Sequence, residues 1–215
     1  MPMLSPESRR GRRRETQEAL RRADVIAAAS GVFARKGFHD AQVAEIAAQA
    51  ELSLKSVYAL FSGKEEIYEE VVSSSAERMR RGVRERVEAI ADPIERVLVL
   101  IDSLFACFEE NRDLLQIYVG STQGLPWRLR QNMGQSAHEI FHSFTSWVVS
   151  LMEDALRGIA PAGRSTPDAE SLAWCLIGGV TTTATFWLET RPDEPLTRAA
   201  PGVRAVFAPL LARRP

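Results

Sequence analysis

The stretch QVAEIAAQAELSLKSVYAL, residues 42–60, decides the fold of the first part of the chain. Its apolar residues recur at helical spacing on both sides of a polar break, which predicts two short helices, over 42–49 and 53–61. The three residues of the break, 50–52, predict a tight turn between them. Two short helices around such a turn form a helix-turn-helix arrangement.

Capping residues and apolar spacing predict where these helices begin and what they bury. Ser53 is the expected N-cap of the second helix, because a serine hydroxyl accepts a hydrogen bond from the first turn. Asp40 is the expected N-cap of the first. Val57 and Phe61 lie one turn apart and are the expected buried contacts. The serine and glutamate of residues 62–65 predict a capping box that opens a longer helix.

The second short helix presents side chains that suit a nucleic acid. Lys55, Ser56 and Tyr58 are hydrogen-bond donors of short or rigid reach, able to meet phosphate oxygens and base edges in a major groove. Lys64 adds positive charge at the N-terminus of the next helix, where a backbone phosphate could lie. Without further information, two short amphipathic helices could equally be ordinary core elements, so both interpretations stay open.

The chain before residue 42 divides into a basic segment and a helix. Residues 1–15 include RRGRRR at 9–14 and almost nothing apolar, which predicts a disordered basic arm. Gly37 follows two basic residues, as expected just past a helix C-terminus. A helix over 16–36 is predicted by apolar residues at helical spacing, namely Leu20, Ile26, Ala29 and Phe33.

The net charge of −1 conceals an asymmetry. Residues 1–64 hold eleven Lys and Arg against seven Asp and Glu, a balance of +4, whereas the rest of the chain holds sixteen against twenty-one. This distribution favours a polyanionic partner for the front of the chain only. The two cysteines, Cys107 and Cys175, both lie in apolar helical patterns and are expected to be core residues. No secretory signal is recognisable, and a cytoplasmic protein is expected.

Beyond residue 70 every pattern is helical. Pro93 suits the first turn of a helix, a long helix is expected over about 130–157, and further helices over 168–190 and 195–212. Residues 171–188 form one charge-free run long enough to suggest a membrane span, but its threonines and glycines favour a helix buried by protein. Since no period-two pattern appears, the fold class is all-α.

Residues 25–72 resemble the N-terminal DNA-binding domain of the TetR family of transcriptional regulators. The resemblance implies a three-helix DNA-binding head over 16–70 and a helical ligand-binding and dimerisation domain over 71–215. The matching features fall at fixed intervals across three helices and two turns: Phe33, Gly37-Phe38, Val43, Glu45-Ile46-Ala47, Ala50, Ser53, Val57-Tyr58, Phe61 and Lys64-Glu65.

The resemblance further implies a ligand-responsive repressor that acts as a homodimer on a palindromic, double-stranded DNA operator, without enzymatic activity or cofactor. The chain departs from the family pattern at Glu51, where a turn glycine is usual, and at Leu60, where a histidine or aromatic residue is frequent. Arginines of the arm could enter a neighbouring minor groove or follow phosphates. The residues expected to contact DNA are Gln42, Ser53, Leu54, Lys55, Ser56, Tyr58 and Lys64.

In relatives, the last two helices form the dimer interface and the central helices enclose a ligand pocket. Dimer burial would also account for the charge-free run at 171–188, with Gly178 and Gly179 allowing close helix approach. Aromatic residues on the central helices indicate a small apolar or aromatic ligand, although each could be ordinary core. The candidates are Phe105, Phe108, Tyr118, Trp127, Phe141, Phe144, Trp147 and Trp174.

Residues 138–142, HEIFH, match the H-E-x-x-H pattern in which two histidines bind zinc and the glutamate acts as general base. Two alternatives follow: a zinc hydrolase, or a metal-sensing regulator that uses His138 and His142. Thr145 and Val148 stand where the longer protease signature requires Gly and His, which argues against the enzyme. On the helical wheel both histidines border the apolar stripe, and Glu139 projects to the polar side. No metal site is therefore expected.

Overall fold

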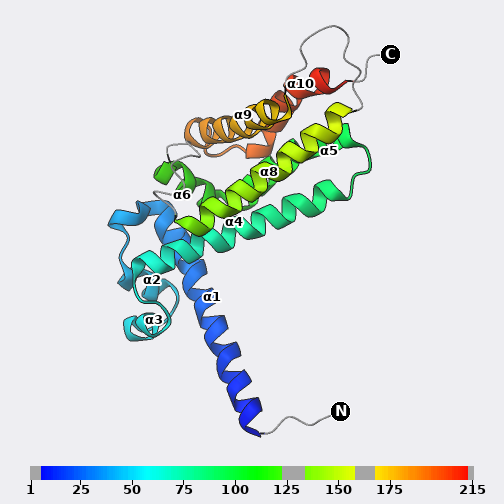
Figure 1. The fold of residues 1–215 in the computed structure, drawn as a ribbon. Coiled ribbons are helices and arrows are strands. Elements are labelled where there is room, and N and C mark those ends of the chain that lie inside the picture. Colours follow the sequence, from blue (N-terminus) through cyan, green and yellow to red (C-terminus); the bar gives the residue numbers. More distant parts are fainter. Residues whose placement is uncertain (1–5, 123–133, 158–167, 213–215) are drawn as a thin grey trace. The chain divides into compact units, whose positions relative to one another are not determined.

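The computed structural model describes residues 6–122, 134–157 and 168–212, and every regular element within these ranges is helical. The predicted all-α class is therefore confirmed. The chain divides into two compact units, residues 1–72 and 73–215, with α4 running across the division. The helices are α1 (Pro6–Asp40), α2 (Val43–Gln49), α3 (Leu54–Leu60), α4 (Lys64–Glu88), α5 (Pro93–Glu110), α6 (Arg112–Thr122), α8 (Gln135–Arg157), α9 (Ala169–Thr190), the 3-10 helix η2 (Leu196–Ala199) and α10 (Ala200–Leu211) (Figure 1).

The first unit packs α1, α2, α3 and the start of α4 around a small apolar core. Val57 and Phe61 are buried in it as predicted, together with Phe33 of α1. The Phe33 ring meets the Tyr68 ring edge to face, with centroids 5.0 Å apart, and this geometry stabilises aromatic pairs. This core fixes the two short helices, α2 and α3, against α1 and the start of α4 as one head.

The prediction of a disordered arm over residues 1–15 is wrong for residues 6–15, because α1 begins at Pro6 and these residues are helical. Low apolar content argues against burial, but the arginines and glutamates of this segment are good helix formers, and the helix over 16–36 supplies the nucleus from which it extends. Helical geometry is interrupted at Gly37, whose φ of 73° lies in the left-handed region. The predicted role of Gly37 at the end of the helix is confirmed.

The caps of the head differ in part from the sequence prediction. Ser53 caps α3 as expected, its Oγ accepting from the Ser56 amide at 3.1 Å. Gln42, not Asp40, is the N-cap residue of α2, and it caps without a side-chain hydrogen bond. Before α4, the amide and hydroxyl of Ser62 donate to Glu66, at 2.7 and 2.8 Å, rather than to Glu65. Helix α4 begins at Lys64, one residue later than the predicted capping box requires. The carboxylate that accepts from Ser62 is therefore that of Glu66, one residue further along the chain.

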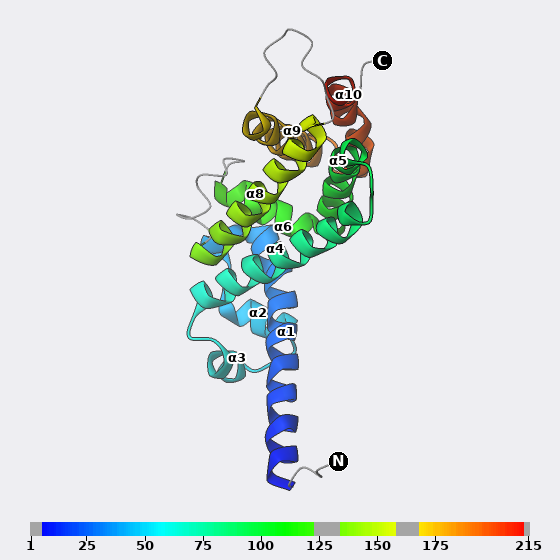
Figure 2. The same cartoon turned by 45° about the vertical axis from the view of Figure 1, so that its right-hand side comes forward.

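The second unit is a layered helical body with its core between α5, α8, α9 and α10. Asp92 caps α5 by accepting from two amides, and Pro93 occupies the first turn as predicted. Asp168 caps α9 through the Ser171 amide at 2.8 Å. Figures 1 and 2 both show α8 running beside α9, which covers one side of the core.

Helix α9 is long and apolar enough by composition to cross a membrane, yet 39% of its apolar window is buried inside the unit. One face, including Leu176 and Val180, is fully buried. The opposite face is exposed and carries Cys175 and Phe186. The prediction that both cysteines are core residues is therefore right for Cys107 and wrong for Cys175.

Candidate nucleic-acid interface and ligand site

Helix α3 buries one side and leaves the other open to solvent. Val57 is inaccessible, whereas Leu54 is 43% and Tyr58 53% exposed. Lys55 is exposed as well. The exposed Leu54 and Tyr58 lie one turn apart, so with Lys55 they place apolar, aromatic and cationic groups together on the open side of α3. Four of the predicted DNA-contacting residues, counting Ser53 at the cap, thus lie on one open face.

Ser53, the N-cap of α3, and Ser56 in its first turn are hydrogen-bonded to each other. The Oγ atoms of Ser53 and Ser56 are 2.8 Å apart, and the Ser53 Oγ also accepts from the Ser56 amide. A hydroxyl has one donor and two acceptor positions, so each can still meet an external group. Gln42 is exposed at the start of α2, where its carbonyl accepts from the Glu45 amide at 3.0 Å and its side chain points to solvent.

Lys64 is engaged within the head, which the sequence did not indicate. Its Nζ donates to the carbonyl oxygens of His39 and Ala41, both at 3.0 Å, and lies 4.6 Å from the centre of the Phe38 ring. An ammonium group has three donors, so one remains for a phosphate. The charge of Lys64 therefore stabilises the junction of α1, α2 and α4 whether or not DNA is present.

Arg22 joins three elements of the head and was missed by the sequence reasoning. Its guanidinium donates to the Leu60 carbonyl at the end of α3 and to Glu66 and Glu70 of α4. The hydrogen bond to Glu70 is the main reason that the Arg22 pKa is raised. Helical spacing could have indicated that Arg22 faces the rest of the head, because it lies four residues before buried Ile26 and therefore on the same face of α1.

The turn between α2 and α3 has a strained residue. Glu51 adopts φ 55°, the left-handed conformation that glycine adopts without cost. The adjoining amides are satisfied, since Leu52 donates to the Ala47 carbonyl and Ala50 to the Ile46 carbonyl, both at 2.9 Å. Glutamate at this position, where the family pattern has a glycine, therefore costs about 1 kcal/mol or more in backbone strain relative to glycine.

The predicted ligand-contacting aromatics do not form one lining in the described part of the chain. Phe105 is fully buried in the core, while Trp174 is 42% exposed and lies 6.2 Å from the Phe141 ring. Trp127 lies outside the described residues. The remaining candidates are partly buried and pack against the same core: Phe108, Tyr118, Phe144 and Trp147.

Three polar atoms of the body are buried without a hydrogen-bond partner in the described part of the chain: Tyr118 Oη, His138 Nδ1 and Trp187 Nε1. Buried polar atoms are normally paired, and an unpaired one calls for an explanation such as an absent ligand. They belong to α6, α8 and α9, three of the helices that build the body.

The HEIFH segment forms no metal site among the described residues. His142 is exposed and His138 is partly buried, with ring centres 6.5 Å apart. Glu139 projects to solvent as expected and accepts from Gln135 at 2.7 Å. Within residues 6–122, 134–157 and 168–212, no three His, Cys, Asp or Glu side chains come together.

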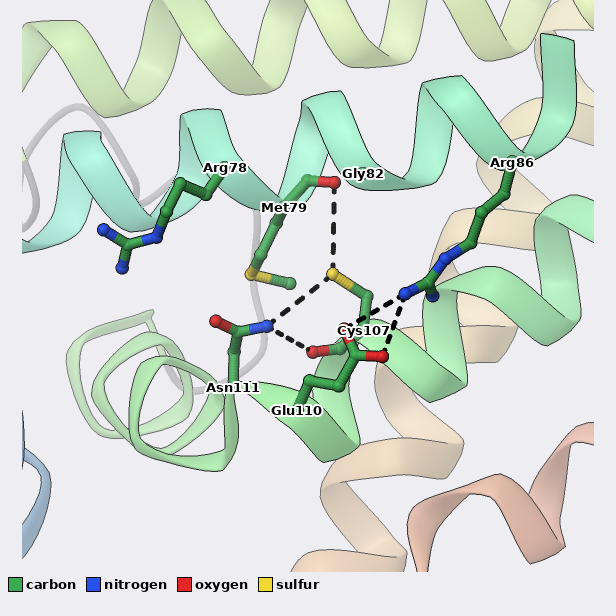
Figure 3. A pocket seen from close by; sticks show the side chains of 7 residues that line it. All are labelled: Arg78, Met79, Gly82, Arg86, Cys107, Glu110 and Asn111. Atoms are coloured by element: carbon green, nitrogen blue, oxygen red, sulfur yellow. Dashed lines mark hydrogen bonds and ion pairs between the residues drawn. The ribbon is translucent and has the colours of Figure 1, made fainter.

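A cavity of about 260 Å³ lies between α4 and α5, and none of the predicted aromatics is among its lining residues (Figure 3). Most polar groups that line this cavity already have partners within the protein. Arg86 pairs with Glu110 at 2.9 Å, and Asn111 donates to the Cys107 carbonyl at 2.8 Å. Figure 3 also shows Arg78 pointing away from the others. The lining residues are Arg78, Met79, Gly82, Arg86, Cys107, Glu110 and Asn111.

Comparison with known proteins agrees with the geometry of the head. The family model of the bacterial regulatory proteins of the tetR family matches residues 25–71. The uncharacterised HTH-type transcriptional regulator YdgC of Bacillus subtilis is 25% identical over 198 residues, which cover 89% of this chain and 93% of that protein. The HTH-type transcriptional repressor KstR2 of Mycobacterium tuberculosis is 26% identical over 178 residues, 82% of this chain and 84% of that protein.

The fold also matches solved structures over most of its length. The transcriptional regulator FadR of Bacillus subtilis, solved in complex with stearoyl-CoA, superposes with a TM-score of 0.70 at 20% identity. The match covers 86% of this chain and 96% of that one. The relatives are regulators, and the reading of HEIFH as the centre of a hydrolase has no support among them.

Proposed function

Because the chain belongs to the TetR family of transcriptional regulators, we propose that α3 enters the major groove of an operator and reads its sequence. The open face of α3 carries this proposal, since it exposes Leu54, Lys55 and Tyr58 on a helix otherwise fixed by buried Val57. A helix of about 10–12 Å diameter fits a major groove about 12 Å wide. Residues 16–70 are the proposed head, and residues 71–215 the regulatory domain.

Each contact residue has a role suited to its chemistry. Lys55 and the hydroxyls of Ser53 and Ser56 donate to phosphate oxygens or base edges, and Tyr58 adds a rigid donor with an apolar ring. Leu54 offers apolar contact to a thymine methyl group. Gln42 at the start of α2 and Lys64 at the start of α4 complete the proposed set, with Lys64 offering the donor that its two carbonyl partners leave free.

The protein acts as a homodimer in this proposal. Phe186 of α9 and Val206 and Leu210 of α10 are 54%, 60% and 53% exposed, so the last two helices share uncovered apolar surface. Gly178 and Gly179 of α9 are half-buried, and a Cβ added to either would meet no atom within 4 Å. Apolar surface of this kind favours burial against a second copy. A two-fold dimer would read a palindromic operator.

A small molecule with a large apolar part is the proposed effector, and its binding in the cytoplasm would release the operator. A ligand with polar groups could also pair with His138 Nδ1 and Trp187 Nε1, which have no hydrogen-bond partner within the described chain. FadR of Bacillus subtilis was solved with stearoyl-CoA, which combines an acyl chain with polar groups. Such a ligand lowers DNA affinity only if it prefers the conformation that does not bind DNA.

The proposal is tested by fluorescence anisotropy with a duplex that the full chain selects from a random pool. The selected duplex should bind at least about a thousandfold more tightly than an unrelated one at physiological salt. Stearoyl-CoA and octanoyl-CoA, added at equal concentration, probe the effector class, with coenzyme A as the control for its polar part. Equal affinity for selected and unrelated DNA would exclude a sequence-specific regulator.

A further inference from the structure

The first part of α1 is a basic helix that is exposed on all sides. Residues 11–20 are all exposed, and Figures 1 and 2 both show α1 continuing as a free helix past α3, within the same unit. This stretch includes Arg12, Arg13 and Arg14, the last three arginines of RRGRRR. Successive helical residues are about 100° apart, so these side chains cover more than half of the helix circumference.

These three arginines differ from most arginines elsewhere in the chain. Among the described side chains, Arg12, Arg13 and Arg14 form no ion pair with a carboxylate. By contrast, ion pairs to Asp or Glu neutralise many others, namely Arg22, Arg80, Arg84, Arg86, Arg112, Arg157, Arg198 and Arg204. These three guanidinium groups are therefore available to an anionic partner, although Glu15 and Glu18 lie on the same helix and lower its net charge.

The sequence also places like charges where a helix brings them together. Arginines at 9 and 13, and at 10 and 14, are four residues apart. Like charges at this spacing destabilise a helix by about 0.2–0.5 kcal/mol for each pair in water. A polyanion would reduce this repulsion and stabilise the helix.

The distance between the basic helix and α3 can be counted from Arg22. Its guanidinium donates to the Leu60 carbonyl, so this point of α1 lies at the end of α3. At about 1.5 Å per residue, Arg14 lies about 12 Å and Arg12 about 15 Å further along α1. The major groove is about 12 Å wide, so the basic helix is about one groove width from the end of α3. The nearest anions at that distance on bound DNA are the phosphates that flank the groove.

We propose that Arg12, Arg13 and Arg14 bind the phosphate backbone beside the site read by α3, an inference that rests on the proposed function. The helical conformation decides between the two roles that the sequence left open. A helix about 10 Å across cannot enter a minor groove about 6 Å wide, but its side chains can reach phosphates on the groove edge. These contacts add affinity without adding sequence preference.

The salt dependence of DNA binding by the full chain tests this proposal. The variant R12A/R13A/R14A keeps the helix, because alanine is the best helix former and all three positions are exposed. Each lost phosphate contact lowers the slope of log K against log salt by about 0.9, so the slope should fall by about 2.7 per basic helix. Affinity should fall equally for selected and unrelated duplexes.

The matched control is R157A/R191A/R198A, which removes the same charge at exposed positions of the second unit. Its salt slope should equal that of the unsubstituted protein. If the unsubstituted protein binds the selected duplex and R12A/R13A/R14A shows the same slope, the basic helix does not bind phosphates and the proposed function still stands. If the unsubstituted protein shows no preference for the selected duplex, the proposed function itself fails.

Discussion

The guanidinium of Arg22 lies 4.1 Å from the centre of the Phe61 ring while donating to the carbonyl of the residue before it, Leu60. A cation over an aromatic face is stabilised by the ring quadrupole, and here the same cation also pairs with Glu66 and Glu70. One side chain thus connects α1, the end of α3 and α4. This connection holds the end of α3 against α1 and α4.

Replacing Arg22 should destabilise the head. Arg22→Met keeps most of the side-chain volume but removes the donor to the Leu60 carbonyl and the cation that pairs with Glu66 and Glu70, at a cost of about 1–3 kcal/mol. Urea unfolding measures this change as a lower free energy of unfolding. The control, Arg198→Met, removes an exposed pair with Glu194 and should cost about 0.5 kcal/mol or less. Equal effects of the two changes would mean that the Arg22 contacts contribute nothing.

Replacing the turn residue Glu51 with glycine should stabilise the folded protein. Glu51→Gly relieves the left-handed backbone strain and is expected to raise the free energy of unfolding by about 1 kcal/mol. Glu51→Ala is the matched control, because it removes the same carboxylate but keeps the Cβ that causes the strain. Thermal unfolding should show a higher Tm for the glycine variant alone. A similar gain with alanine would assign the effect to charge rather than to conformation.

The proposed dimer should separate when charge is placed on its apolar surface. V206E/L210E puts two carboxylates where the α10 side chains are exposed, so folding is preserved but burial against a second copy becomes unfavourable. Light scattering should report a fall from twice the chain mass of 23.9 kDa to one. Leu20→Glu, at a 61% exposed position of α1, is the control and should leave the mass unchanged.

The two thiols should react at different rates, and only one rate should depend on the dimer. Burial raises the pKa of Cys107 to about 11, so roughly one part in a thousand is thiolate at pH 8 and alkylation by iodoacetamide is slow. Cys175 is exposed on α9 beside the glycines of the proposed interface. Mass spectrometry should show faster alkylation of Cys175 in V206E/L210E than in the unsubstituted protein. Equal rates would place Cys175 outside the interface.

Local patterns predicted the parts of the head that depend on neighbours in sequence. The N-cap at Ser53 and the buried pair Val57 and Phe61 follow from spacing within a few residues. The strained turn at Glu51 followed instead from the family resemblance, which places a glycine there. The roles of Arg22 and Lys64 followed from neither, because their partners lie between 23 and 48 residues away in the chain. Such contacts depend on how helices pack, which periodicity does not specify.

Composition also misled in two places for physical reasons. The scarcity of apolar residues in 1–15 indicates that nothing there is buried, but an exposed segment can still continue a helix that begins as a nucleus further along. Apolar periodicity placed Cys175 in the core, whereas α9 is apolar on both faces and only one packs inward. Apolar surface that a monomer exposes and core that it buries have the same sequence pattern.

Binding of K55A/Y58A to the selected duplex tests the central claim that α3 reads DNA. Both side chains are exposed, so the fold is retained, and a dimer loses four contacts of about 1 kcal/mol or more each. The affinity should fall by roughly 1,000-fold, and by much less for unrelated DNA, which loses only any phosphate contacts. The control, R35A/Q49A, removes one charge and a bonded pair outside α3 and should bind as the unsubstituted protein does. Unchanged affinity of K55A/Y58A would contradict the account.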